Sequence, residues 1–299
     1  VDVTLFATLD SITLARLDGV CERPYEEDGE LDGRVWEALH VGHALERSAD
    51  FDLIHNHLDW LPLALAGLAA APMVTTVHGF SSPRILPAYR RSGGAFVSIS
   101  DADRSPDLDY VATVHHGVDT AALPFSPAAG DGLVCFGRIH PDKGTAAAIE
   151  IARAAGRPLV LCGPVQDERY FAEEVEPHVD GEAVRYAGSV GPEERARVLG
   201  AAACLLHPIG FDEPFGLSVV ESMLCGTPVV AYDRGSMPEL VEDGVTGVLA
   251  DGVAGAVAGV ARAAGFDRSA CRRTAERRFS VDRMVDDYLD VYERVLHDR

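Results

Sequence analysis

Short apolar runs rich in β-branched residues recur along this chain, with helical patterns between them. The first group is VDVTLFAT from Val1, FDLIHN, PMVTTV, AFVSIS and YVATVH from Tyr110. A stretch with Pro and Gly, LPFSPAAGDG from Leu123, interrupts the rhythm, which restarts with LVCFG, PLVLCG, AVRYAG, CLLHPI, TPVVAY and TGVLA. Strands this apolar, alternating with helices, predict parallel sheets that helices cover on both faces.

The break near Leu123 predicts two domains, and a chain of 299 residues with 47% apolar content is long enough to build both. We expect an α/β fold of two Rossmann-like, doubly wound domains facing a central cleft. The expected bounds are 1–122, 123–279 and, for a helix packing back across the domains, 280–299. Because Val1 opens directly in a strand, we expect the natural protein to carry an earlier strand, loop and helix.

The formal net charge of −21 argues against nucleic acid as a partner, since nucleic-acid phosphates are normally met by clustered Lys and Arg. Residues 1–120 hold 8 Arg, no Lys and 19 Asp or Glu, a balance of −11 that an anionic membrane would repel. No apolar stretch approaches a membrane span, and no basic-then-apolar leader opens the sequence. We therefore expect a cytoplasmic protein without membrane association.

Six cysteines are scattered along the chain without a C-x-x-C pair. This spacing argues against a zinc or redox site, and four of the six lie inside or beside apolar runs. We predict reduced core residues at all six positions: Cys21, Cys135, Cys162, Cys204, Cys225 and Cys271.

The segment GRIHPDKGT places two cations around the end of one predicted strand. It follows LVCF and precedes the helical run AAAIEIARA. Arg138 leaves the carboxyl end of the strand, where ligands of open α/β sheets bind, and Lys143 stands at the entrance of the next helix. Lys143 is also the only lysine beside 25 arginines. A bound phosphate would explain this pair, and a solvated loop lysine is the alternative interpretation.

A second polar feature lies in the apolar segment FDEPFGLSVVESMLCG. We expect a short buried helix with Pro214 in its first turn and Gly226 at its far end. One small or polar stripe would run along this helix: Ser218, Glu221, Ser222 and Cys225. Burying Glu221 alone would be costly, so the stripe faces either a polar ligand or a buried ion pair. The first amides of the helix would suit a diphosphate.

These motifs closely resemble those of the retaining glycosyltransferases of family 4, which have the GT-B fold. In the C-terminal half the resemblance rests on Gly137-Arg138 with Lys143, Glu213-x7-Glu221, Gly226-Thr227-Pro228-Val229-Val230 and Glu239-Leu240-Val241-Glu242-Asp243-Gly244-x2-Gly247. In the N-terminal half it rests on His78-Gly79, Ser100 and Gly117-Val118-Asp119. The order and spacing of the C-terminal motifs make the resemblance specific.

The resemblance implies a role for each matching residue. Arg138 and Lys143, beside Gly137, would hold the donor diphosphate and stabilise the leaving group. Glu213 would contact the donor sugar, Glu221 the nucleotide ribose, and His78 would line the sugar pocket from the opposite domain. Backbone groups and the base site complete the set: Phe215, Gly216 and Leu217 for sugar or phosphate, and Gly188, Ser189 and Val190 for the base. Neither metal nor cofactor is implied beyond the nucleotide sugar, because two cations and a helix dipole stabilise the departing charge.

Three positions depart from the family pattern. The glycine-rich loop after the first strand is absent, His115-His116 stands where Asn is usual before Gly-Val-Asp, and Arg234-Gly235 replaces a Gly-Gly pair. Two further patterns mimic metal sites. Asp101-Ala102-Asp103 matches a D-x-D signature of metal-dependent transferases of another fold, yet it follows a strand and is expected to cap a helix. His55-Asn56-His57 could ligate a metal, an interpretation that we disfavour.

The resemblance implies transfer of a sugar from a nucleotide diphosphate donor to a hydroxyl of a soluble acceptor, with retention of configuration. The acceptor hydroxyl would attack on the face that the diphosphate leaves, without the carboxylate nucleophile of retaining hydrolases. Two alternatives stay open: a GT-B sugar-nucleotide epimerase, and a catalytically silent nucleotide-sugar-binding module. For the acceptor we expect a natural-product oligosaccharide, such as an antibiotic intermediate of the avilamycin kind. The motifs do not separate uridine, guanosine and adenosine donors.

Overall fold

The structure is a computed structural model that describes residues 1–25, 28–80 and 82–297. It divides into two compact units. Unit 1 comprises Val1–Ser98, Ser105–Ala112 and Leu289–Arg299, and unit 2 comprises Ile99–Arg104 and Thr113–Tyr288. The main part of unit 2 therefore begins at residue 113, earlier in the chain than the break near Leu123. The last helix contributes residues to both units.

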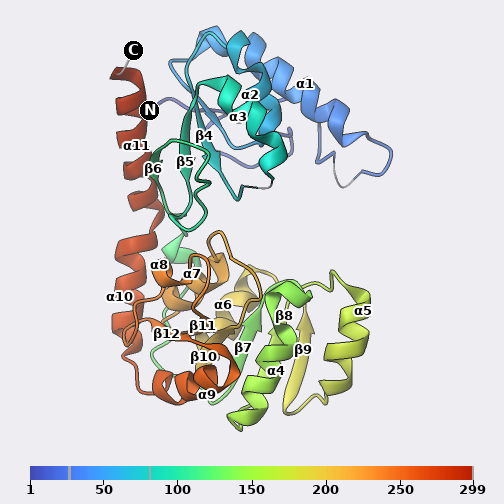
Figure 1. Cartoon of the computed structure of the whole chain (residues 1–299), viewed down its shortest axis with the longest axis vertical. Coiled ribbons are helices and arrows are strands. Elements are labelled where there is room, and N and C mark those ends of the chain that lie inside the picture. Colours follow the sequence, from blue (N-terminus) through green and yellow to red (C-terminus); the bar gives the residue numbers. More distant parts are fainter. Residues whose placement is uncertain (26–27, 81, 298–299) are drawn as a thin grey trace. The chain divides into compact units, whose positions relative to one another are not determined.

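Unit 2 is built on a six-stranded parallel sheet with the order β12-β11-β10-β7-β8-β9 (Figure 1). Its strands are β7 (Leu133–Phe136), β8 (Leu159–Cys162), β9 (Val184–Gly188), β10 (Cys204–His207), β11 (Val229–Tyr232) and β12 (Gly247–Ala250). From β7 the chain adds β8 and β9 on one side and then crosses back to β10. The strand order thus reverses between β7 and β10, where open α/β sheets bind ligands.

Helices cover both faces of this sheet, because side chains along each strand alternate between them. Leu133 and Cys135 pack with helices α4 (Thr145–Ala154) and α9 (Gly252–Ala263). Val134 and Phe136 pack with α6 (Pro192–Ala201), α7 (Leu217–Leu224) and α10 (Arg268–Phe279). The expected doubly wound arrangement is confirmed in this unit.

Unit 1 contains a four-stranded sheet of order β3-β4-β5-β6 and a separate parallel pair, β1-β2. The strands are β1 (Thr4–Phe6), β2 (Arg16–Asp18), β3 (Ile54–Asn56), β4 (Met73–Val77), β5 (Ala95–Ser98) and β6 (Tyr110–Thr113). Every residue of β4 is buried, as expected for a strand covered on both faces. Its helices are α1 (Gly33–Glu46), α2 (Trp60–Leu65) and α3 (Leu86–Ser92), and the core gathers around Leu63, Tyr89 and Phe96.

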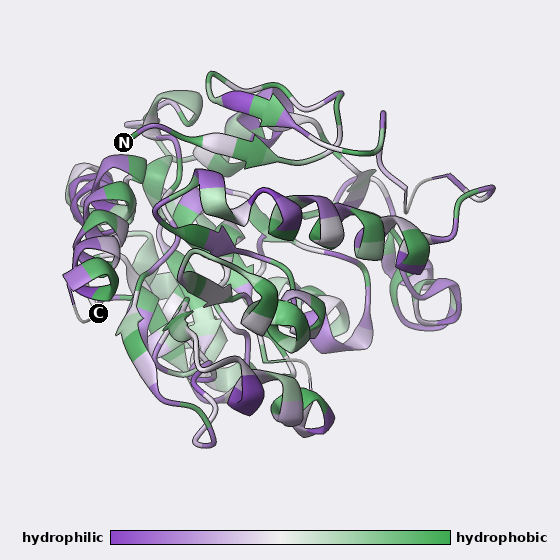
Figure 2. Cartoon of the chain, turned by 90° about the horizontal axis from the view of Figure 1, so that it is seen from above, coloured by the Kyte–Doolittle hydropathy of each residue, from purple (hydrophilic) through white to green (hydrophobic). Residues whose placement is uncertain are grey.

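The last helix, α11 (Val281–His297), was expected over Val281 to Leu296 and is confirmed. It carries both hydrophilic and hydrophobic residues (Figure 2), and Tyr288 and Val291 are buried. The remaining elements are short: α5 (Glu168–Tyr170), α8 (Met237–Leu240), one π-helical turn (Phe171–Val175) and 3-10 turns at Ser48–Asp50, Ala66–Leu68, Pro83–Ile85, Thr120–Ala122, Pro141–Lys143 and Glu176–His178.

All six cysteines are buried with free thiols, which confirms that they are core residues. Burial raises the pKa of Cys135 and Cys204 to about 12 each, so these thiols stay protonated. Within the described part of the chain, no helix is both long and apolar enough to cross a membrane.

Candidate functional site

Lys143 and Glu213 meet at the point where the strand order of unit 2 reverses. Lys143 follows β7 and Glu213 follows β10, so the carboxyl ends of neighbouring strands bring them together. The Lys143 ammonium donates to Glu213 Oε2, and both side chains are largely buried. The Lys143 Nζ also lies 4.7 Å from the centre of the Phe211 ring, a cation–π contact. An ordered cation is therefore held at this edge of the sheet.

Glycines allow the loops that carry these residues to pack backbone against backbone. Gly144 has a φ of +68°, and a Cβ there would lie 1.9 Å from the carbonyl oxygen of Pro208. Gly235 has a φ of +54°, and its Cβ would lie 2.4 Å from the amide nitrogen of Glu213. Both positions therefore require glycine, for space as well as for conformation. The close approach sets the position of Glu213 against the loop after β11.

Arg234, one of the departures from the family pattern, is tied to the same loops. Its guanidinium donates to the carbonyl of Gly210 and lies 3.8 Å from the Asp212 carboxylate. The Gly210 amide donates in turn to the carbonyl of Asp142, at 2.7 Å. The Arg234 side chain thus links the loops after β11 and β10, and about half of it is exposed.

His207, the last residue of β10, was not singled out from the sequence. Its Nε2 lies 3.9 Å from Glu213 Oε2, is fully buried and has no hydrogen-bond partner. Burial, with a smaller contribution from the Lys143 charge, lowers the pKa of His207 to about 3, so the imidazole is neutral at pH 7. A polar residue at the end of an apolar strand, directly before Pro208, was the signal that could have revealed it.

Arg138 is exposed, and its guanidinium donates to the side chain of Gln166. The backbone around it is closely packed: the Gly137 amide donates to the carbonyl of Cys162, and a Cβ on Gly163 would lie 1.8 Å from the Gly137 carbonyl oxygen. Arg138 and Lys143 follow the same strand. Arg138 is paired with the neutral side-chain amide of Gln166, whereas Lys143 is paired with the carboxylate of Glu213.

Glu221 on α7 is ion-paired through one of its two oxygens. Arg195 on α6 donates to Glu221 Oε1 at 2.8 Å, and Glu221 Oε2 is buried without a hydrogen-bond partner. Burial raises the pKa of Glu221, and the charge and hydrogen bond of Arg195 oppose that rise. Two other residues of the predicted stripe lie in the core: Ser222 donates to the Thr227 carbonyl, and Cys225 is buried.

The start of α7 differs from the expectation. Pro214 does not lie in the first turn: the helix begins at Leu217, and Gly216, with a φ of +102°, is its N-cap. The carbonyls of the two residues before Gly216 accept side-chain hydrogen bonds: the Ser100 hydroxyl donates to Pro214, and the Ser236 hydroxyl donates to Phe215. These two bonds keep the preceding backbone out of helical pairing. The C-terminal expectation is confirmed, because Gly226 follows the helix with a φ of +83°.

The segment Ser189–Val190 follows β9, with Ser189 exposed and Val190 half-buried against the core. The segment therefore lies at the carboxyl end of β9, the last strand in the order of the sheet.

His78 belongs to unit 1 and follows β4. Its Nε2 lies 3.0 Å from the Nδ1 of His57, and desolvation together with the neighbouring His78 lowers the pKa of His57 to about 4. His55 is engaged by Thr76 and by Tyr292. In the described residues no group of three or more His, Cys, Asp or Glu side chains is arranged to hold a metal.

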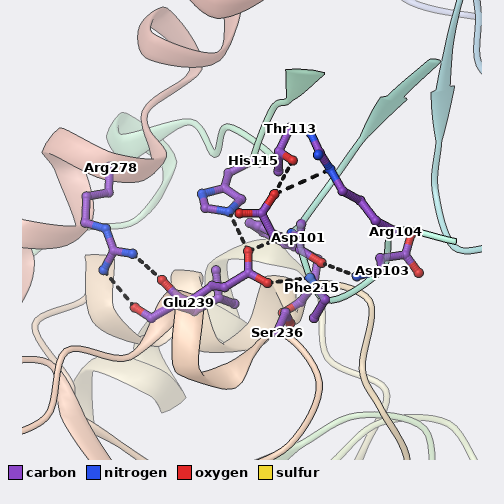
Figure 3. Close-up of polar contacts among 12 residues, drawn as sticks. Asp101, Asp103, Arg104, Thr113, His115, Phe215, Ser236, Glu239 and Arg278 are labelled. Carbon is purple, nitrogen blue, oxygen red and sulfur yellow. Dashed lines mark hydrogen bonds and ion pairs between the residues drawn. The ribbon is translucent and has the colours of Figure 1, made fainter. Parts of the chain in front are cut away.

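Asp101-Ala102-Asp103 does not cap a helix, because the chain makes a turn there. Figure 3 shows the contacts of this turn: the Glu239 carboxylate accepts from the amides of Asp101 and Ala102, at 2.8 and 2.6 Å, and lies 3.1 Å from His115 Nε2. The Asp101 side chain accepts from Thr113 and lies 3.5 Å from Arg104. The motif is therefore occupied by contacts within unit 2, and the sequence expectation of a helix cap was wrong.

Known proteins resemble this chain in sequence and in fold. Residues 130–264 match the family model described as "Glycosyl transferases group 1". The chain is 28% identical to the glycogen synthase of Mycobacterium tuberculosis (strain CDC 1551 / Oshkosh), over 91% of the chain and 76% of that protein.

Two solved structures support the same fold. AviGT4, a glycosyltransferase involved in avilamycin A biosynthesis, matches with a TM-score of 0.72 and 25% identity over 96% of this chain and 82% of its own. Anabaena Alr3699/HepE in complex with UDP and glucose matches with a TM-score of 0.73 and 20% identity, over 93% and 86%. The predicted GT-B fold class with Rossmann-like domains is confirmed.

Proposed function

We propose, from the premise that this chain is a GT-B glycosyltransferase of the group 1 family, that it transfers a sugar from a nucleotide diphosphate donor to an acceptor hydroxyl with retention of configuration. The observation that carries the proposal is the Lys143–Glu213 pair at the strand-order reversal of unit 2. A cation held at the carboxyl ends of parallel strands is placed to bind an anion. A phosphate of the donor would suit the Lys143 ammonium, and a hydroxyl of the sugar would suit the Glu213 carboxylate.

In this proposal Arg138 and Lys143 bind the diphosphate and stabilise its charge as it leaves. The bond from the anomeric carbon to the diphosphate oxygen breaks, and a bond to the acceptor oxygen forms on the same face of the sugar. A phosphate oxygen takes the proton of the acceptor hydroxyl. Glu213 orients the sugar through its hydroxyls, and no protein carboxylate attacks it.

The other expected contacts keep their places in the proposal. Glu221 accepts from the ribose, and its partnerless Oε2 supports that role. Ser189 and Val190 lie by the base, and the backbone of Phe215, Gly216 and Leu217 bonds to sugar or phosphate. His78 is also kept as a proposed sugar contact. Neither a metal nor a cofactor takes part.

The acceptor that we propose is a soluble natural-product oligosaccharide in the cytoplasm. The supporting observations are the charge of −21, which disfavours anionic membranes, and the likeness to AviGT4. The proposed specificity can be checked by incubating the protein with a donor and a panel of oligosaccharides, and by determining the anomeric configuration of the product.

The deciding experiment measures the thermal midpoint with UDP, GDP, ADP and TDP, because a ligand that binds only the native state must raise it. We expect at least one nucleotide diphosphate to do so. A protein that none of the four stabilises is not a transferase of this kind. Incubation with the donor alone separates the rivals: an epimerase makes a new sugar nucleotide, and a silent module turns over nothing.

A further inference from the structure

Arg195 is the charged residue that forms an ion pair with Glu221. It lies in the first turn of α6, where its amide donates to the carbonyl of Gly191 at 2.9 Å, directly after the predicted base segment. Its side chain then reaches α7 and donates to Glu221 Oε1 at 2.8 Å. The pair is partly shielded, since Glu221 is 14% and Arg195 38% exposed.

An aromatic ring fixes the guanidinium of Arg195 from a second direction. Its Cζ lies 4.7 Å from the centre of the Phe136 ring, at the carboxyl end of β7. Phe136 is itself buried in the core, so its ring cannot easily move away. A planar cation held by a ring and by a carboxylate has few orientations left.

The carboxylate of Glu221 is half used. Oε1 has its partner, while Oε2 is buried and has none. A buried acceptor that lacks a donor costs free energy, and a ligand hydroxyl would remove that cost. Arg195 contributes in two ways: its charge and hydrogen bond oppose the rise in the Glu221 pKa that burial causes, and by engaging Oε1 it leaves Oε2 for the ligand.

We infer that Arg195 is a positioning residue that turns Glu221 Oε2 toward a ribose hydroxyl and thereby sets a preference for ribonucleotide over deoxyribonucleotide donors. The inference rests on the proposed function, which brings the ribose to Glu221. It goes further because it assigns the discrimination between ribose and deoxyribose to the arrangement of Arg195, Glu221 and Phe136. Without Arg195, the buried carboxyl of Glu221 would protonate more readily, and its Oε2 would no longer be fixed in one orientation.

The test is calorimetric binding of UDP, GDP and ADP, each beside its 2′-deoxy and 3′-deoxy form, to the full chain. For the nucleotide that binds the wild type, we expect a ribose preference of about tenfold, the size of one hydrogen bond to a charged group. Arg195→Met should weaken the ribonucleotide to the level of its deoxy form, so that the ratio falls toward one. Arg195→Lys should keep much of the ratio.

Arg197 provides the matched control. It lies on the same helix and pairs with Glu194 at the surface, with 64% of its side chain exposed. Arg197→Met should leave the ratio unchanged. Arg195→Gln, which keeps a donor but not the charge, is the second variant if Arg195→Met does not fold, and its ratio should fall between wild type and one.

The binding measurements separate the proposed function from the role of Arg195. If the wild type binds none of the nucleotides, the proposed function is wrong, and the role of Arg195 falls with it. If the wild type prefers the ribonucleotide and a folded Arg195→Met or Arg195→Gln variant keeps that preference in full, only the role of Arg195 is overturned. A variant that weakens ribo and deoxy forms equally also overturns it, because that loss does not involve the hydroxyl.

Discussion

At the scale of single residues, Lys143 concentrates the proposed chemistry. It is the only lysine of the chain, and it is held by Glu213 and by the Phe211 ring. Lys143→Ala should lower turnover by about 100-fold, the usual cost of losing one charge-stabilising donor in an active site. The fold should be retained, because the pair lies in loops at the edge of the sheet. Steady-state kinetics and circular dichroism test both parts.

Lys143→Arg is the control for charge, since it keeps the cation but changes its shape. It should retain more activity than Lys143→Ala. Turnover in Lys143→Ala equal to that of the wild type would remove Lys143 from the phosphate role.

His207 should make stability depend on pH. Its pKa is about 3 in the folded protein and near 6.5 in an unfolded chain. Between those values the unfolded chain binds a proton that the native protein does not, so stability is complete above pH 6.5 and is lost as pH falls. We expect urea unfolding at pH 7 and pH 5 to show this loss. In His207→Asn the difference between the two pH values should be smaller, and an unchanged difference would contradict the buried neutral imidazole.

At the scale of elements, periodicity predicted more than local geometry. The continuous apolar run LVCF predicted a strand that helices cover on both faces, and in the structure Leu133 and Val134 pack on opposite faces of the sheet. The start of α7 was mispredicted, because Pro214 and Phe215 accept hydrogen bonds from Ser100 and Ser236, both distant in sequence. Such bonds leave no trace in a local pattern. The same holds for the contact between Arg195 and Glu221, which lie on different helices.

Gly235 carries a prediction about the loop after β11. Gly235→Ala would force a Cβ to within 2.4 Å of the Glu213 amide nitrogen, besides the strain of a φ of +54°. We expect a stability loss of about 1–3 kcal/mol and a further loss of activity through displacement of Glu213. Urea unfolding and kinetics with a saturating donor measure the two effects.

Gly244→Ala separates strain from collision. Gly244 has a φ of +80°, and its Cβ would meet nothing within 4 Å. This variant should lose stability of the same order but keep its kcat. Equal kcat values in Gly235→Ala and Gly244→Ala would show that the contact with Glu213 has no part in activity.

At the scale of the whole molecule, composition and strand rhythm predicted the fold class, while long-range polar contacts escaped prediction. Glu239 was recognised only as part of a motif, yet its carboxylate accepts from the amides of Asp101 and Ala102 and lies 3.1 Å from His115 Nε2 (Figure 3). These partners are more than 120 residues apart in the chain. Nothing in their local sequence pairs them, since contacts of this kind are created by the fold.

The net charge of −21 leads to a last prediction, because the protein as a whole should repel a nucleotide diphosphate. The Debye length is about 8 Å at physiological ionic strength, so distant carboxylates are screened while Arg138 and Lys143 act at contact. Raising NaCl should therefore weaken nucleotide diphosphate binding, measured as Kd by calorimetry. The same salt should raise the thermal midpoint of the protein alone, since screening relieves its self-repulsion. Binding that tightens with salt would mean that the net charge dominates, and that the phosphates do not touch these two cations.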